Sequence, residues 1–171
     1  MFVNTTDRSY QRMFVELVML ALAVLVFMTA AARGQDISPE TATGISNSTA
    51  DQPLMRDYRG VQIGTPAEEV RNKLGAPADK SDTQDFFLLS DTESAQIFYD
   101  KSQKVLAVSV QYAGDLSAAP TAKALLGADV PPRADGSVYR LVKYQRAGYW
   151  VSYSRTAGDA PIVTVSMRKA D

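Results

Sequence analysis

One succession of elements occurs twice in this 171-residue chain and constrains its fold more than any other feature. Each copy has a short helix pattern that stops at a glycine, Gly75 or Gly127, and three strand-like segments follow. The copies span residues 57–113 and 114–171. The helix and strand patterns together predict an α+β fold. Because a unit of this size buries little core alone, we expect the two copies to join. The fold would consist of two tandem α-β-β-β repeats that form one joined antiparallel sheet with helices on one face.

Both helices have candidate capping residues. Thr65 stands three residues before Glu68, a spacing that predicts a capping box at the start of the first helix. The second helix is predicted within Ala118–Leu126, with Asp115 or Ser117 as its cap. These signals predict two short helices, one at the start of each copy.

Alternating apolar and polar residues mark the strands, which is typical of a sheet with one solvated face. Residues 107–110 and 164–167 take matching places in the third strand of each copy, 57 positions apart. The predicted strands are Phe86–Leu89, Ala95–Tyr99, Val105–Tyr112, Val138–Tyr144, Tyr149–Ser154 and Ile162–Met167.

The first 34 residues have the pattern of a secretory signal peptide. Arg8 and Arg12 precede the uncharged stretch Leu17–Ala32, and small residues follow, so cleavage is expected after Ala32 or Gly34. The alternative is an uncleaved anchor, in which case the protein would contact a membrane. Cleavage of the signal peptide predicts a secreted or periplasmic protein.

Residues 35–56 are rich in Ser, Thr, Asp and Pro and lack hydrophobic periodicity. This composition predicts a disordered linker between the signal segment and the first repeat.

The chain contains neither histidine nor cysteine. Disulfides, His/Cys zinc sites and every Ser-His or Cys-His triad are therefore excluded. The sequence has no phosphate-binding glycine loop, and its net charge of −1 does not favour nucleic acid as a partner. We expect a protein that is not an enzyme and needs no cofactor or metal.

Two carboxylate pairs, Asp82 with Asp85 and Asp91 with Glu93, are the remaining candidates for acid–base chemistry or calcium binding. They stand in hydrophilic, turn-rich sequence without a calcium-loop motif. A solvated acidic edge is the interpretation that this setting favours.

Aromatic and basic residues gather in the first two strands of the second copy. Residues 133–155 contain five basic residues and one acidic residue, whereas residues 79–100 contain one basic and six acidic residues. Tyr, Trp and Arg are enriched at binding hot spots, although these aromatic residues could instead fill the core. The predicted partner-binding residues are Tyr144, Arg146, Tyr149, Trp150, Tyr153 and Arg155.

The stretch from Val61 to Val70, continued by Leu74-Gly75-Ala76-Pro77, resembles the helix-opening motif of the SmpA/OmlA outer-membrane assembly lipoproteins. The tandem arrangement is similar to that of the β-lactamase inhibitory proteins. The resemblance implies an antiparallel sheet after each helix and a role in envelope assembly or inhibition. This chain lacks the lipidated cysteine of the first family and the disulfides of the second.

Two functions follow from these observations. The first is an exported, non-enzymatic interaction module that binds a protein partner, in the cell envelope or outside the cell, through the aromatic and basic sheet face. The second is a small extracytoplasmic ligand-binding protein, or a hydrolase that depends on Ser/Lys or carboxylate groups.

Overall fold

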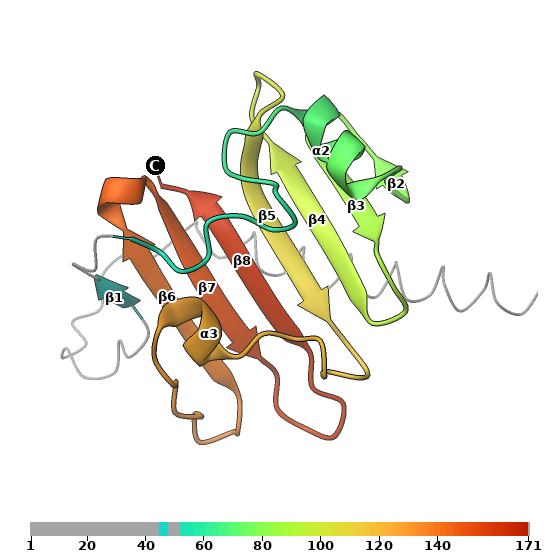
Figure 1. The fold of residues 1–171 in the computed structure, drawn as a ribbon. Coiled ribbons are helices and arrows are strands. Elements are labelled where there is room, and N and C mark those ends of the chain that lie inside the picture. Colours follow the sequence, from blue (N-terminus) through green and yellow to red (C-terminus); the bar gives the residue numbers. More distant parts are fainter. Residues whose placement is uncertain (1–44, 48–51, 171) are drawn as a thin grey trace, which may run out of the picture. The chain divides into compact units, whose positions relative to one another are not determined.

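The computed structural model describes residues 45–47 and 52–170, which form a mostly β structure around one sheet (Figure 1). The strand order is β1-β6-β7-β8-β5-β4-β3-β2; β2 to β8 are antiparallel, and β1 pairs parallel with β6. The strands are β1 (Ile45–Asn47), β2 (Asp79–Lys80), β3 (Gln84–Leu88), β4 (Glu93–Tyr99), β5 (Val105–Tyr112), β6 (Val138–Tyr144), β7 (Tyr149–Arg155) and β8 (Val163–Lys169). The helices are α2 (Ala67–Leu74), α3 (Ala122–Leu126) and the 3-10 turn η1 (Gln145–Ala147). The expected signal segment, residues 1–34, lies outside the described residues.

The six predicted strands are confirmed, each end to within two residues. Their alternation places one set of side chains in a single core, for example Val108 of β5 and Val151 of β7, which are both 0 % exposed. The third strands of the two halves, β5 and β8, are direct neighbours in the sheet. One continuous antiparallel sheet therefore spans both halves.

The first helix ends at Gly75 as predicted, but its predicted start is wrong. No side chain caps α2, and the Thr65 hydroxyl accepts the Gln62 N–H instead (3.0 Å). The Val105 N–H donates to the Thr65 carbonyl (2.9 Å) and the Gly64 N–H donates to the Val105 carbonyl (2.8 Å), so this segment is held against β5. The Ala67 N–H at the start of the helix donates to the Gln103 carbonyl (2.9 Å), so the turn between β4 and β5 satisfies it.

The second helix is shorter than predicted and has a different cap. Thr121 accepts the Ala124 N–H (3.2 Å), and α3 ends at Gly127, whose φ of 78° suits the left-handed C-cap. Asp115 instead accepts the Ser117 N–H, which stabilises a local turn. Asp115 and Ser117, which were predicted to cap the helix, therefore form an Asx turn with each other instead.

The end of the predicted linker is part of the folded structure. Residues 45–47 form β1, and Met55 is buried in the core. From there the chain crosses the core side of the sheet as a strap, residues 52–63, which ends beside α2 (Figure 1). Met55, Tyr58 and Val61 on the strap belong to the same core cluster as the strands.

A tight turn fixes the middle of the strap. Tyr58 and Val61 exchange two backbone hydrogen bonds (2.9 and 2.8 Å). Arg59 and Gly60 between them both have positive φ, 50° and 79°, as the primed hairpin turns require. Glu93 of β4 holds this turn by accepting from Tyr58 Oη (2.8 Å) and pairing with Arg59.

Met167→Ala tests the joined core. Met167 of β8 is 0 % exposed, so its truncation leaves a cavity and should lower the free energy of unfolding by about 2–5 kcal/mol. Leu54→Ala is the control, because Leu54 is 62 % exposed, and it should change stability by less than about 0.5 kcal/mol. Urea unfolding curves measure both, and equal effects would contradict a core centred on β8.

Candidate protein-interaction site

The six predicted partner-binding residues do not share one exposed surface. Tyr144 and Tyr153 are buried, at 5 % and 7 % exposure, and belong to the core cluster. Tyr149 lies on the same side but is only partly buried, because it stands where β7 begins. Trp150 projects to the opposite side of the sheet, and Arg155 is exposed at the far end of β7. For Tyr144 and Tyr153, filling the core is the role that their burial supports.

An open cavity of about 710 Å³ lies where the strap meets the turn between β6 and β7. That turn is η1 followed by Gly148, whose φ of 72° allows the chain to reverse direction before β7. Tyr149 Oη donates to the Met55 carbonyl (3.0 Å) and ties the strap to the sheet here. The cavity is lined by Gln52, Pro53, Arg56, Gln62, Ile63, Arg146, Ala147 and Tyr149.

A second cavity, of about 310 Å³, adjoins the same turn and shares Tyr149 with the first. The Tyr144 and Tyr149 rings that line it have centroids 6.3 Å apart and are tilted by 48°, a favourable aromatic arrangement. Its lining is Lys143, Tyr144, Gln145, Tyr149, Trp150 and Ala170. We call the two cavities together the η1 groove.

The η1 groove brings together four of the six predicted residues, Tyr144, Arg146, Tyr149 and Trp150, and leaves out Tyr153 and Arg155. Arg56 and Lys143 add positive charge, and the described lining contains no Asp or Glu. Burial raises the pKa of Tyr149, so its hydroxyl is protonated at neutral pH. Aromatic surface beside guanidinium and ammonium groups suits a partner with apolar and anionic side chains.

Trp150 has a basic residue on each side across the sheet. In the strand register it is opposite Lys143 of β6 and Arg168 of β8. Directly opposite residues project from the same side of an antiparallel sheet, with Cβ atoms about 5 Å apart. The indole is therefore the centre of a small basic and aromatic row at this end of the sheet.

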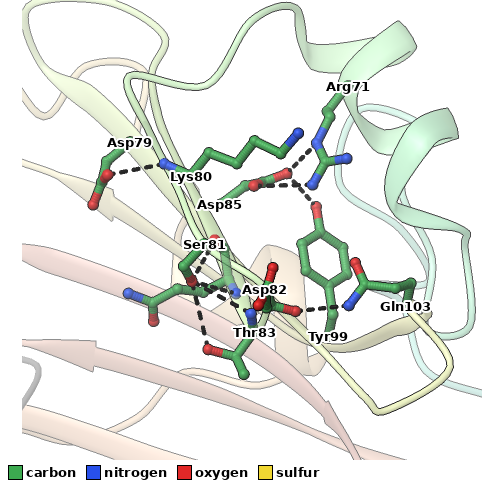
Figure 2. A network of polar contacts seen from close by, with 10 residues as sticks. Arg71, Asp79, Lys80, Ser81, Asp82, Thr83, Asp85, Tyr99 and Gln103 are labelled. Atoms are coloured by element: carbon green, nitrogen blue, oxygen red, sulfur yellow. Dashed lines mark hydrogen bonds and ion pairs between the residues drawn. The ribbon is translucent and has the colours of Figure 1, made fainter.

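The predicted solvated acidic edge is wrong for two of its four carboxylates. Asp85 of β3 is 0 % exposed, and its carboxylate accepts from Arg71 Nε of α2 (2.8 Å) and Tyr99 Oη of β4 (2.8 Å) (Figure 2). Arg71 makes a second bond to the other carboxylate oxygen (3.2 Å). Glu93 is likewise occupied by the strap, whereas Asp82 and Asp91 are exposed.

The Asp85 network is structural. It links α2, β3 and β4, and neither Asp85 nor its two partners line the η1 groove. Hydrogen bonding to Asp85 raises the pKa of Arg71, and burial followed by the Asp85 bond raises that of Tyr99. These shifts keep Arg71 charged and Tyr99 neutral, which are the states that the network requires.

Sequence reasoning missed the strap residues of the site, above all Arg56. Gln52, Pro53 and Arg56 lie within the segment whose composition predicts a linker, and the groove residues Arg146 and Tyr149 that line the same cavity are distant in sequence. The local signal that could have indicated the strap is the apolar triplet Met55, Tyr58 and Val61, which recurs at intervals of three.

Within residues 45–47 and 52–170 no three acidic side chains are placed to hold a metal ion. Over the same residues, no helix has the length and apolar character needed to cross a bilayer. Comparisons with protein-family models, curated proteins and solved structures find no match to this chain.

Asp85→Asn tests the structural role of the buried carboxylate. The loss of charge weakens the bonds from Arg71 and Tyr99 and should lower the free energy of unfolding by about 1–3 kcal/mol. The cost stays in this range because the Arg71 side chain is 25 % exposed and can turn to water. Asp82→Asn is the matched control, because Asp82 is exposed, and it should be nearly neutral. Equal chemical-denaturation midpoints for the two variants would contradict the assignment.

Tyr112 makes stability fall at alkaline pH. Burial, aided by Glu93, raises its pKa to about 12, whereas a tyrosine in the unfolded chain ionises near pH ~10. Between these values the folded protein holds a proton that the unfolded chain has lost, so the free energy of unfolding decreases as the pH rises. Tyr112→Phe should reduce this slope by about 1.4 kcal/mol per pH unit in urea titrations between pH ~10 and ~12. An unchanged slope would show that Tyr112 does not contribute to this decrease.

Proposed function

We propose that this chain is an exported, non-enzymatic interaction module that binds a protein partner, in the cell envelope or outside the cell, through the η1 groove. The observation that carries the proposal is the gathering of Tyr149, Trp150, Arg56, Lys143 and Arg146 around two adjoining cavities that share Tyr149. Aromatic and arginine side chains at the centre of a concavity are typical of binding hot spots.

Export is supported by the sequence of the first 34 residues, with its basic start, uncharged stretch and small residues before Ala32. Every residue of the η1 groove lies after Gly34, so cleavage there would leave the site complete. Retention of the segment would instead hold the same site near a membrane.

We also infer that the fold is a duplicated α-β-β-β unit with both helices on one face of the sheet. Ser109 and Ser166, 57 positions apart, are register partners between β5 and β8, as a two-fold axis through this pair would require. The Ser166 hydroxyl donates to that of Ser109 (3.1 Å). Side chains of α2 and α3 pack into the same core cluster, which supports a common face. This arrangement is the one implied by the resemblance to SmpA/OmlA and β-lactamase inhibitory proteins.

Binding a small molecule is the second candidate function, and the size of the larger cavity favours it. A volume of about 710 Å³ lies within the range of about 300–1,000 Å³ that is usual for ligand sites. A hydrolase has less support, because the buried carboxylate Asp85 is engaged by Arg71 and Tyr99 in a network outside the groove.

The test is capture of partners with matched variants of the immobilised protein. Trp150→Ala and Arg56→Glu each remove a groove side chain and should weaken binding of a true partner by about 30-fold, the effect of a typical hot-spot truncation. Arg155→Glu changes the same type of charge at the far end of β7 and should leave binding intact. The readout is quantitative mass spectrometry of proteins captured from envelope and medium fractions.

The three variants must first show the wild-type urea midpoint, so that unfolding is not mistaken for lost binding. An identical set of captured proteins from wild type, Trp150→Ala and Arg56→Glu would reject the groove as a protein-binding site. A small molecule that co-purifies with wild type and is lost from both groove variants would favour ligand binding instead.

A further inference from the structure

The two cavities of the η1 groove differ in chemistry and share one side chain. The described lining of the larger cavity includes two guanidinium groups and two amides, from Arg56, Arg146, Gln52 and Gln62. The described lining of the smaller cavity includes three aromatic rings, from Tyr144, Tyr149 and Trp150. Tyr149 belongs to both linings. A ligand that fills the whole groove therefore needs a polar part and an apolar part placed side by side.

Arg56 brings positive charge to the larger cavity. Its Nε donates to the Pro53 carbonyl (3.3 Å), and a terminal nitrogen donates to the Gln52 side chain. Both acceptors are neutral, so they orient the guanidinium group without cancelling its charge. The carboxylate of the neighbouring Asp57 accepts the Gly60 N–H (2.8 Å) and is not part of the described lining. The larger cavity therefore suits a carboxylate, to which a guanidinium group forms charge-assisted hydrogen bonds.

Tyr149 is held in place between the polar and the aromatic parts of the groove. Its hydroxyl donates to the Met55 carbonyl (3.0 Å), and its ring packs at a tilt against that of Tyr144. Burial raises the pKa of Tyr149, and the charge of Arg56 opposes this rise, so the guanidinium group lies close enough to act on the phenol. Because the shared side chain is anchored before any ligand binds, the spacing of the two parts is fixed in advance.

This spacing selects a pattern of residues in the ligand. Two groups that contact one ring from its two sides lie about 7 Å apart, since each contact is about 3.5 Å long. In an extended chain, residues two positions apart project from the same side and are also about 7 Å apart. Adjacent residues project from opposite sides instead.

We propose that the η1 groove binds an extended segment of a partner protein in which one residue separates an acidic residue from an aromatic residue. The carboxylate enters the larger cavity beside Arg56, and the aromatic side chain enters the smaller cavity against Trp150. This inference rests on the proposed function and names the motif that the same site recognises.

Four capped peptides probe the motif by calorimetric titration of the full-length chain. Glu-Ala-Phe-Ala-Glu contains the spacing in both chain directions, and Ala-Glu-Phe-Glu-Ala has the same composition with adjacent residues. Gln-Ala-Phe-Ala-Gln lacks the charge, and Glu-Ala-Ala-Ala-Glu lacks the ring. We expect the first peptide to bind at least about tenfold more tightly than each of the others, as the loss of one charge-assisted contact would give. No binding of the first peptide, or equal binding of the two isomers, would overturn the proposal.

Two groove variants assign each part of the peptide to its cavity. Arg56→Gln should abolish the preference for Glu over Gln and keep that for Phe over Ala, whereas Trp150→Ala should do the reverse. Unfolding cannot produce this crossed pattern, because it removes both preferences. Arg155→Gln, at the far end of β7, is the matched control and should keep both. Since Lys143 lines the smaller cavity, loss of the Glu preference in Lys143→Gln but not in Arg56→Gln would overturn the assignment.

The peptide titrations and the capture experiment fail independently. If no peptide binds but the groove variants lose captured proteins, the motif is wrong and the proposed function stands. If the first peptide binds with the crossed pattern but capture is unchanged in the groove variants, the motif is supported as the ligand of the groove and the captured proteins bind elsewhere. As the single tryptophan of the chain, Trp150 should also change its fluorescence when the first peptide binds, which locates the peptide in the groove.

Discussion

The pairing of β5 with β8 is the interaction on which the rest of this structure depends. Val108 lies opposite Met167 and Val110 opposite Val165, and none of the four is more than 2 % exposed. If the two halves were separated at this ladder, each would have one more unpaired edge and a core open on one side. A unit of about 55 residues buries too little surface to be stable in that state. Joined, the two halves bury one continuous core without a disulfide, which this cysteine-free chain cannot form.

The breadth of the joined sheet explains why the strap is needed and where the candidate site lies. The helices α2 and α3, of eight and five residues, contribute few side chains to the core, and Met55, Tyr58 and Val61 of the strap add to it. The strap is held at both ends, by Tyr149 through the Met55 carbonyl and by Val105 through Gly64. Since Arg56 lies between the buried Met55 and Tyr58, core packing also positions a charged side chain of the η1 groove.

Local sequence patterns predicted what depends on neighbouring residues and missed what depends on distant ones. Strands such as β5 and β6 follow from alternation, and the helix stops at Gly75 and Gly127 follow from the backbone freedom of glycine. The cap at Thr65 failed because Val105, forty residues away, binds its backbone. The groove was predicted in part, since alternation divides the aromatic residues of β7 between two faces but does not say which face the strap and helices will cover. Tyr153 and Tyr149 both lie on the covered face; Tyr153 is buried there, whereas Tyr149, where β7 begins, stays partly accessible.

Folding also creates a charge asymmetry that the net charge of −1 conceals. At the β2–β4 side, carboxylates are used internally: Asp85 by Arg71 and Tyr99, and Glu93 by Arg59 and Tyr58. Asp100 there accepts backbone N–H groups, which lowers its pKa and keeps it ionised within a turn. At the β6–β7 side, Arg56, Lys143 and Arg146 line cavities whose described walls contain no carboxylate. The walls of these cavities therefore combine basic groups with aromatic contact area, which suits an anionic and apolar partner.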